Sequence, residues 1–180
     1  MDMTLPSMTL VLGGAASGKS DYAERLVCAA RRPMVYIATA MAHDDEMSDK
    51  ISRHQVRRGS GWRTVEAPTD VVSALAGVSA EEVVLLDCAT MWLSNHMFSD
   101  MDVEAAERLL INAISDCPAP VVVVSNEVGA GIVPENALAR RFRQAQGELN
   151  QRLAARSDLV LTVMAGLPLA LKGTLPKGAP

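Results

Sequence analysis

A glycine-rich segment directly behind an apolar run constrains this chain more than any other feature. The run covers residues 8–12, and the segment at 13–20, GGAASGKS, matches the phosphate-binding pattern G-x-x-x-x-G-K-[ST] at every fixed position. Glycine lets the backbone curl so that successive N–H groups point at phosphate oxygens, and a following helix adds the positive end of its dipole. The pattern predicts a strand, a phosphate loop and a helix; the alternative is a glycine-rich turn without a ligand.

The individual residues of this segment have distinct expected roles toward a nucleoside triphosphate. Lys19 is expected to reach the outer phosphates, and the Ser20 hydroxyl is expected to coordinate Mg²⁺. The backbone around the phosphates would come from Gly13, Gly14, Ala15, Ala16, Ser17 and Gly18.

Apolar runs alternate with segments of helical spacing along the rest of the chain. Runs at 8–12, 34–38, 83–86, 121–124 and 159–163 predict buried strands. The alternation favours an α/β fold of the P-loop NTPase type, a mainly parallel sheet with helices on both faces. Two of the predicted helices would bury Tyr22, Ala23, Leu26, Val27 and Ala30, and Leu109, Leu110 and Ile114.

Length and composition predict a single domain over residues 1–180, because 180 residues with 49% hydrophobic content can bury one substantial core. The segment 173–180 is rich in glycine and proline, and we expect it to be poorly ordered. The longest helix should begin near Pro134 and bury Leu138, Phe142, Ala145, Leu149 and Leu153. Its arginines, Arg140, Arg141, Arg143 and Arg152, form either a solvated surface or a partner or substrate surface.

Charge and cysteine usage narrow the surroundings in which the chain works. The net charge of −4 gives no general attraction to nucleic acid or to an anionic membrane. Cys28, Cys88 and Cys117 are widely spaced and odd in number, as expected of reduced thiols in the cytoplasm. The first apolar run is too short for a signal core or a membrane span. We therefore expect a cytoplasmic protein.

Residues just beyond the strands are the first candidates for a ligand site, because open α/β sheets bind ligands at the carboxyl ends of their strands. Asp87 follows one such strand and would orient Mg²⁺; otherwise it is a turn or helix-capping residue. The loop with Gly129 and Gly131 is either a mobile cover or a wide turn. The other candidates are Ala38, Thr39, Ala40, Cys88, Ser125, Asn126 and Glu127.

One histidine lies in a segment suited to covalent chemistry. Residues 44–58 start acidic and end basic, which matches the dipole of a helix. His54 is either a partly buried packing residue or a nucleophile that attacks an α-phosphate, with Arg53, Arg57 and Arg58 neutralising the charge. His43 and His96 are expected to be surface or loop residues.

Taken together, the motifs resemble a known family. In the family's order, the chain carries the phosphate loop and the segments 36–40, 45–54, 62–66, 86–92 with Asn95, and 126–136. It closely resembles the bifunctional adenosylcobinamide kinase and adenosylcobinamide-phosphate guanylyltransferase family of cobalamin biosynthesis, the CobU/CobP family, from about Thr9 to Lys172. Ala16 departs from the family, which often has arginine there, and this change could weaken phosphate contacts.

The resemblance implies two reactions on a small corrinoid substrate. The first phosphorylates adenosylcobinamide with ATP or GTP, and the second transfers GMP from GTP to that phosphate with release of pyrophosphate. It makes His54 the guanylylated residue, with Lys19 and Mg²⁺ on the phosphates, and implies a homo-oligomer, expected to be a trimer. Beyond the phosphate loop, it places at the nucleotide Ala38, Thr39, Ala40, Gln55, Val56, Arg57, Arg58, Glu66 and Asp87.

Two other functions stay open from the residues alone. One is a small-molecule kinase that uses only γ-phosphoryl transfer, with His54 in a structural role. The other is a nucleotide-dependent switch whose Gly129 loop reports the bound state to a protein partner.

Overall fold

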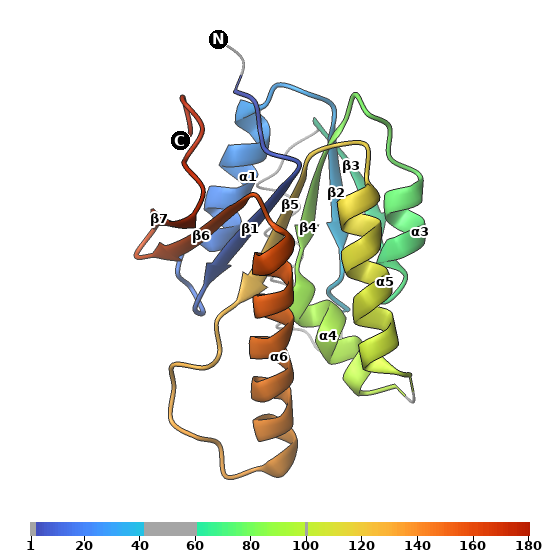
Figure 1. Ribbon diagram of the computed structural model, residues 1–180, viewed down its shortest axis with the longest axis vertical. Helices are drawn as coiled ribbons and strands as arrows, with labels where there is room; N and C mark the ends of the chain where they lie inside the picture. Colours follow the sequence, from blue (N-terminus) through green and yellow to red (C-terminus); the bar gives the residue numbers. More distant parts are fainter. Residues whose placement is uncertain (1–2, 42–60, 100) are drawn as a thin grey trace.

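The computed structural model describes residues 3–41, 61–99 and 101–180, whose strands share one sheet (Figure 1). The helix expected at 44–58, with His54 and residues 55–58, lies outside the described residues, as does His43. The described strands are β1 (Met8–Gly13), β2 (Met34–Ala38), β3 (Trp62–Glu66), β4 (Val83–Asp87), β5 (Val121–Asn126), β6 (Leu159–Met164) and β7 (Leu167–Lys172).

The sheet confirms the predicted α/β class. The strand order is β3-β2-β4-β5-β1-β6-β7, and every neighbouring pair is parallel except β6 and β7. All five predicted strands are present, and the two that prediction missed, β3 and β7, lie at the edges of the sheet. Edge strands need not be apolar on both faces, and β3 (WRTVE) accordingly lacks a continuous apolar run, whereas β7 (LPLALK) is interrupted by a proline.

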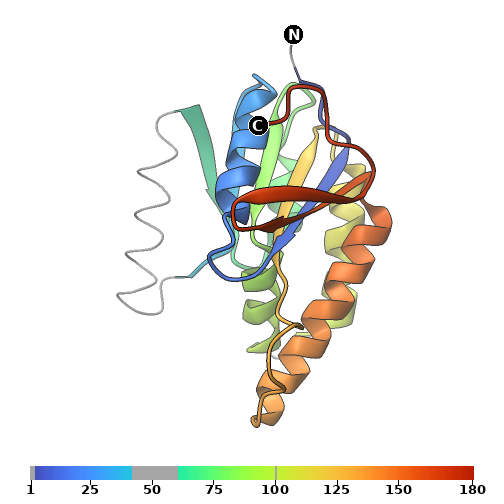
Figure 2. The ribbon, with the colours of Figure 1, turned by 90° about the vertical axis from the view of Figure 1, so that its left-hand side faces the viewer.

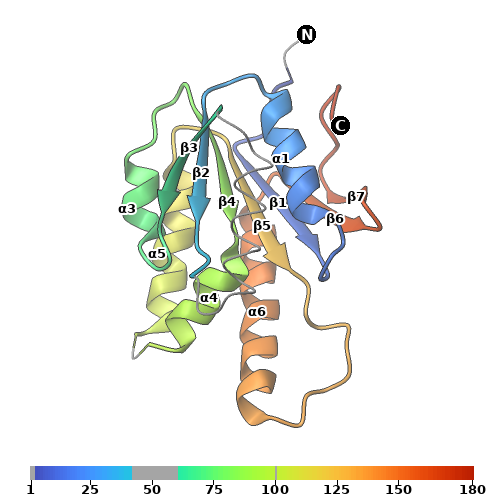
Figure 3. The same cartoon turned by 180° about the vertical axis from the view of Figure 1, so that it is seen from behind.

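Helices cover both faces of the sheet, as predicted (Figure 2). One face is covered by α1 (Lys19–Ala29), which buries the predicted Tyr22, Ala23, Leu26, Val27 and Ala30 against the strands (Figure 3). The opposite face carries α3 (Val71–Ala76), α4 (Ala89–Met97), α5 (Val103–Asp116) and α6 (Ala137–Arg156). With both faces covered, each valine or leucine of β4 and β5 is buried, and each contributes about 1.5–3 kcal/mol to folding.

Two predicted helices differ in detail from the structure. In α5, Leu110 and Ile114 are buried, but Leu109 is 60% exposed because it lies about 100° round the helix from Leu110. The last long helix begins at Ala137 rather than near Pro134, because Asn136 caps it by accepting from the N–H groups of Leu138 and Ala139. Leu138 then lies in the exposed first turn, 37% exposed.

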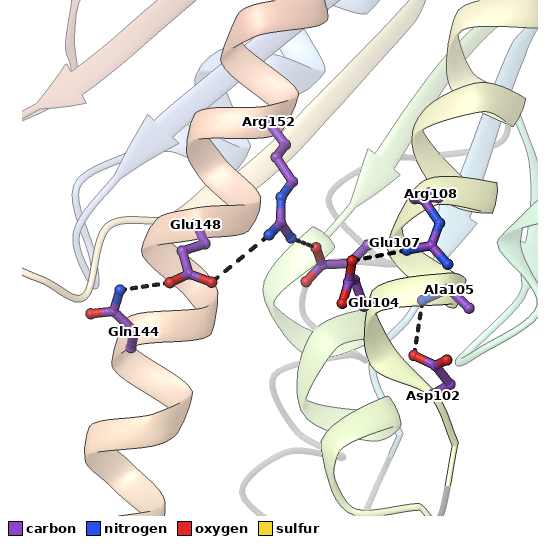
Figure 4. A network of polar contacts seen from close by, with 8 residues as sticks. All are labelled: Asp102, Glu104, Ala105, Glu107, Arg108, Gln144, Glu148 and Arg152. Atoms are coloured by element: carbon purple, nitrogen blue, oxygen red, sulfur yellow. Dashed lines mark hydrogen bonds and ion pairs between the residues drawn. The ribbon is translucent and has the colours of Figure 1, made fainter.

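Helices α5 and α6 are joined by a polar network (Figure 4). Arg152 of α6 donates to the buried carboxylate of Glu107 and lies 3.9 Å from Glu148. Burial raises the pKa of Glu107, and the charge of Arg152 opposes this shift. The Arg152 side chain is 47% exposed, which fits the predicted solvated surface, and it also pairs with the buried Glu107.

His96 is buried, which contradicts the expected surface or loop position. It lies in α4, is 2% exposed, and its Nδ1 is 2.9 Å from the carbonyl oxygen of Trp92. The ring lies 4.1 Å from the Trp92 ring between centroids. Since four residues separate the two positions, both fall on the packed side of the helix.

The C-terminal segment 173–180 forms no helix or strand, and Ala179 packs against the core on the α1 face. None of the described helices is long and apolar enough to cross a lipid bilayer.

Candidate functional site

The phosphate loop follows β1 and leads directly into α1. The backbone N–H of Ser17 donates to the Gly14 carbonyl oxygen at 3.3 Å, and the Lys19 Nζ donates to the same oxygen at 3.1 Å. Gly18 has φ of +88°, which glycine adopts without the strain a side chain would bring. The segment thus has the curled backbone that its sequence predicted.

The end of β6 and the turn between β6 and β7 lie close to the phosphate loop. A Cβ at Gly13 would lie 2.8 Å from the Val163 carbonyl oxygen and 2.3 Å from the Ser17 Oγ. The turn between β6 and β7 also touches the loop, because the Gly166 N–H donates to the Ser17 carbonyl oxygen at 2.8 Å. Sequence reasoning missed this support, although the Ala165-Gly166 pair between two apolar runs is a turn signal.

The register of the sheet brings three predicted residues together at its carboxyl edge. Ala38 of β2 is paired with Glu66 of β3 on one side and with Asp87 of β4 on the other. The Tyr36 hydroxyl donates to the Asp87 Oδ2 at 3.2 Å. Tyr36 and Ala38 pack in the core under α1, so these groups share the face on which α1 lies. They are therefore on the side of the sheet where Lys19 and Ser20 begin that helix.

Thr39 and Asn95 fix the backbone beside Asp87. The buried Thr39 Oγ1 donates to the Cys88 carbonyl oxygen at 2.7 Å and accepts from the Cys88 N–H at 2.8 Å. The Asn95 amide donates to the carbonyl oxygens of Thr39 and Pro68, both at 2.9 Å. Cys88, rather than Asp87, caps α4, which leaves the Asp87 carboxylate out of the cap. Ala40 continues from Thr39 and is half-buried.

The buried Cys88 thiol has a raised pKa. Its pKa is raised to about 11, mainly by burial and also by the Asp87 carboxylate, while the Lys19 ammonium opposes the rise. A thiol with a raised pKa stays protonated at neutral pH, so Cys88 is a structural residue and not a nucleophile.

The donor set at this edge suits Mg²⁺. Asp87 offers a half-buried carboxylate and Ser20 a half-buried hydroxyl on the same face of the sheet. Mg²⁺ prefers oxygen ligands and commonly binds one or two protein groups together with substrate phosphates. Within residues 3–41, 61–99 and 101–180, no three His, Cys, Asp or Glu side chains gather as a protein-only metal cage.

A buried polar network fixes the end of β5, where it meets the phosphate loop. Asn126 is paired with Gly13, its N–H donates to the Thr90 Oγ1 at 2.8 Å, and its carbonyl accepts from the Asn150 Nδ2 at 3.0 Å. Ser125 donates to the Asn150 Oδ1 at 2.6 Å, and Gln146 donates to both residues. Sequence reasoning missed Thr90, Gln146 and Asn150, since single polar residues on helices give no signal of burial.

Residues 127–136, here called the outer loop, leave β5 beside the phosphate loop and run along α6 (Figure 1). The Glu127 N–H donates to the Gly13 carbonyl oxygen at 3.0 Å. Arg143 donates to the Gly129 carbonyl, and Arg140 donates to the Pro134 carbonyl at 2.9 Å. These two arginines thus hold the outer loop against α6. The sequence predicts a solvated surface or a partner or substrate surface for them, and does not predict this contact within the chain.

Comparison with solved structures confirms the fold class. The RadB recombinase matches with a TM-score of 0.51 and 16% identity, covering 88% of this chain and 74% of that one. A type III secretion ATPase matches with a TM-score of 0.52 and 8% identity, covering 92% and 57%. The sheet and the phosphate loop define this protein as a P-loop NTPase-type protein.

Comparison of sequences identifies the family. The model of the cobinamide kinase / cobinamide phosphate guanyltransferase family matches residues 9–171. The bifunctional adenosylcobalamin biosynthesis protein CobU of Salmonella typhimurium (strain LT2) is 42% identical, covering 92% of this chain and 99% of the relative. The corresponding protein CobP of Pseudomonas aeruginosa is 40% identical, covering 91% and 96%. The chain belongs to the cobinamide kinase / cobinamide phosphate guanyltransferase family, as its motifs predicted.

Proposed function

We propose that this chain phosphorylates adenosylcobinamide with ATP or GTP and then transfers GMP from GTP to the new phosphate, giving adenosylcobinamide-GDP and pyrophosphate. The observation that carries the proposal is that the phosphate loop, Asp87 and Glu66 lie at the same edge and on the same face of the sheet, in a chain whose family is described by these two activities. The substrates are a small corrinoid and nucleotides.

In the kinase step, the backbone of residues 13–20 surrounds the β- and γ-phosphates, and the Lys19 ammonium neutralises their charge. Lys19 rests on the Gly14 carbonyl oxygen, at the mouth of the loop, from where its flexible side chain reaches phosphate oxygens. Ser20 and Asp87 hold Mg²⁺, which when bound offsets further negative charge on the phosphates. Ala38, Thr39, Ala40 and Glu66 line the rest of the nucleotide site.

In the transferase step, His54 is the covalent carrier. Its neutral imidazole nitrogen bonds to the α-phosphorus of GTP while the bond to the β-phosphate oxygen breaks, and pyrophosphate leaves. A phosphate oxygen of the corrinoid then attacks the same phosphorus and breaks the P–N bond. Residues 55–58 (Gln55, Val56, Arg57 and Arg58) hold the nucleotide. His54 and residues 55–58 lie outside the described residues, and the sequence motif is the support for their roles.

Labelling with GTP that carries ³²P at the α-phosphate tests this function. We expect one GMP per chain by intact mass spectrometry, with acid-labile and base-stable label, as a phosphoramidate gives. The adduct should vanish in His54→Ala and persist in His43→Ala, a histidine in the same part of the sequence. Label that persists in His54→Ala would remove His54 from this role.

The same reaction mixtures separate the alternative. Transfer of the γ-phosphate to adenosylcobinamide without any GMP adduct or pyrophosphate would leave only a single-activity kinase. A nucleotide switch would instead show slow hydrolysis that a protein partner accelerates, with no transfer to the corrinoid.

For its organisation, we propose a single domain over residues 1–180 that acts in the cytoplasm as a homo-oligomer, with a trimer as the expected state. An exposed apolar face supports association: Leu167, Leu169 and Leu171 of β7 are each more than half exposed. Light scattering on the purified chain should give about three times the mass of one chain, and a monomer at micromolar concentration would contradict the proposal.

A further inference from the structure

Glu127 has no role in the proposed reactions, although its backbone bonds to the first residue of the phosphate loop. Among the described strands, acidic residues at or directly after the carboxyl ends are Glu66, Asp87 and Glu127. The first two share the α1 face and are occupied by the nucleotide and by Mg²⁺ in the proposed site. Glu127 instead follows β5, the strand paired with β1, and is exposed.

The backbone of Glu127 is fixed to the phosphate loop from two directions. Its N–H donates to the carbonyl oxygen of Gly13, the first residue of the loop, at 3.0 Å. The preceding residue, Asn126, is held by Thr90 and Asn150 in the buried network. A residue held in this way keeps a constant position relative to the phosphates that the loop would bind.

The side chain of Glu127 is also oriented, although it is exposed. Its Oε1 accepts from the Gly129 N–H at 2.5 Å, and the Gly129 carbonyl accepts in turn from Arg143. A Cβ at Gly129 would lie 2.7 Å from that same Oε1, so only glycine leaves the carboxylate in this place. An exposed carboxylate that is oriented by its own loop, on a residue whose backbone bonds to the phosphate loop, is suited to accept a proton.

We propose that Glu127 is the general base of the kinase step. The Glu127 carboxylate takes the proton from the acceptor hydroxyl of the corrinoid while the hydroxyl oxygen bonds to the γ-phosphorus. The bond from the γ-phosphorus to the bridging oxygen breaks, and ADP or GDP leaves. This assignment rests on the proposed function. The transferase step needs no such base, because a neutral imidazole nitrogen and a corrinoid phosphate oxygen are the nucleophiles there.

This difference between the two steps gives the test. Glu127→Gln keeps the size of the side chain and removes the proton acceptor, and Glu135→Gln makes the same change at an exposed position of the outer loop. Each variant is assayed for γ-phosphoryl transfer from ATP to adenosylcobinamide, and separately for the GMP adduct formed with GTP alone.

For Glu127→Gln, kcat of the kinase should fall by about 100-fold or more, with KM for ATP changed by less than about threefold. The GMP adduct should form at the wild-type rate, and Glu127→Asp should recover part of the kinase rate. Glu135→Gln should behave as wild type in both assays.

Retention of more than about a third of the kinase rate in Glu127→Gln would overturn the assignment. Equal loss of the kinase activity and the GMP adduct would also overturn it, because the residue would then only support nucleotide binding. Failure of the proposed function looks different: the wild type itself would transfer no phosphate to adenosylcobinamide, which removes the reaction that Glu127 is assigned to.

Discussion

The phosphate loop and the outer loop leave neighbouring strands at the same edge of the sheet, yet they are held in different ways. The phosphate loop is held by backbone bonds: Ser17 binds Gly14, and Gly166 binds Ser17. The outer loop is held mainly by long side chains, Arg140 and Arg143, that reach its carbonyl groups from α6. One loop is thus held by its own backbone, whereas the other depends on two arginine side chains of α6.

Among the changes that compare the two loops, the largest effect is expected from a methyl group added to the phosphate loop. In Gly13→Ala, the new Cβ meets the Val163 carbonyl at 2.8 Å, so the loop must shift. We expect the free energy of unfolding to fall by about 1–3 kcal/mol, and affinity for a GTP analogue to fall by about tenfold or more. Urea unfolding measures the free energy of unfolding, and titration calorimetry measures the affinity.

Gly131→Ala is the matched change in the outer loop. No atom lies within 4 Å of a Cβ built there, so the free energy of unfolding should change by less than about 0.5 kcal/mol. If both alanine variants bind the nucleotide equally well, the rigidity of the phosphate loop does not matter for binding.

An intermediate effect, on amide hydrogen exchange, is expected when one arginine tether of the outer loop is removed. Arg143→Ala removes the bond to the Gly129 carbonyl, whereas Arg141→Ala removes an exposed arginine of the same helix. Amide hydrogen exchange at Gly129 should become several-fold faster in the first variant only, because a typical intramolecular hydrogen bond contributes about 0.5–1.5 kcal/mol. Equal acceleration in residues 13–20 would mean that the two loops move together.

The contrast between these loops also marks what sequence could and could not predict. The phosphate loop and the strands behind it were predictable, since the loop is a contiguous motif and β1, β4 and β5 are apolar on both faces. The edge strands were missed: β3 carries exposed Arg63 and Thr64, and β7 exposes its leucines.

The tethers of the outer loop and the buried network beneath it could not be predicted either. Arg143 and Asn150 meet partners that lie 14 and 24 residues away in sequence, Gly129 and Asn126. Periodicity assigns such polar residues to a solvated face, because it contains no information on which loop packs there. Leu109 failed for a related reason, as adjacent leucines cannot both face the core of one helix.

The smallest effect is a pH dependence in α5, the helix that is ion-paired with α6. Burial raises the pKa of Glu107, so the folded chain binds this proton more tightly than the unfolded chain. Its contribution to stability is therefore present at acid pH and declines as pH rises through and above 4.5, the ordinary value for glutamate.

Glu107→Gln removes this titration while keeping the side chain's size. Urea midpoints of wild type and variant, measured between about pH 4 and 7, should show the wild type losing stability relative to the variant as pH rises. A difference that is constant with pH, or one that changes in the opposite direction, would show that the ion pair with Arg152 dominates over burial.

Whether residues 13–20 hold the triphosphate is tested most directly by titrating a non-hydrolysable GTP analogue into Lys19→Ala, with Lys177→Ala as the exposed control. Removing the Lys19 ammonium should weaken binding by about 30-fold or more, as expected when a phosphate loses a hydrogen-bonded charge partner, while Lys177→Ala binds as wild type. Equal affinity in Lys19→Ala and wild type would contradict a nucleotide site at this loop.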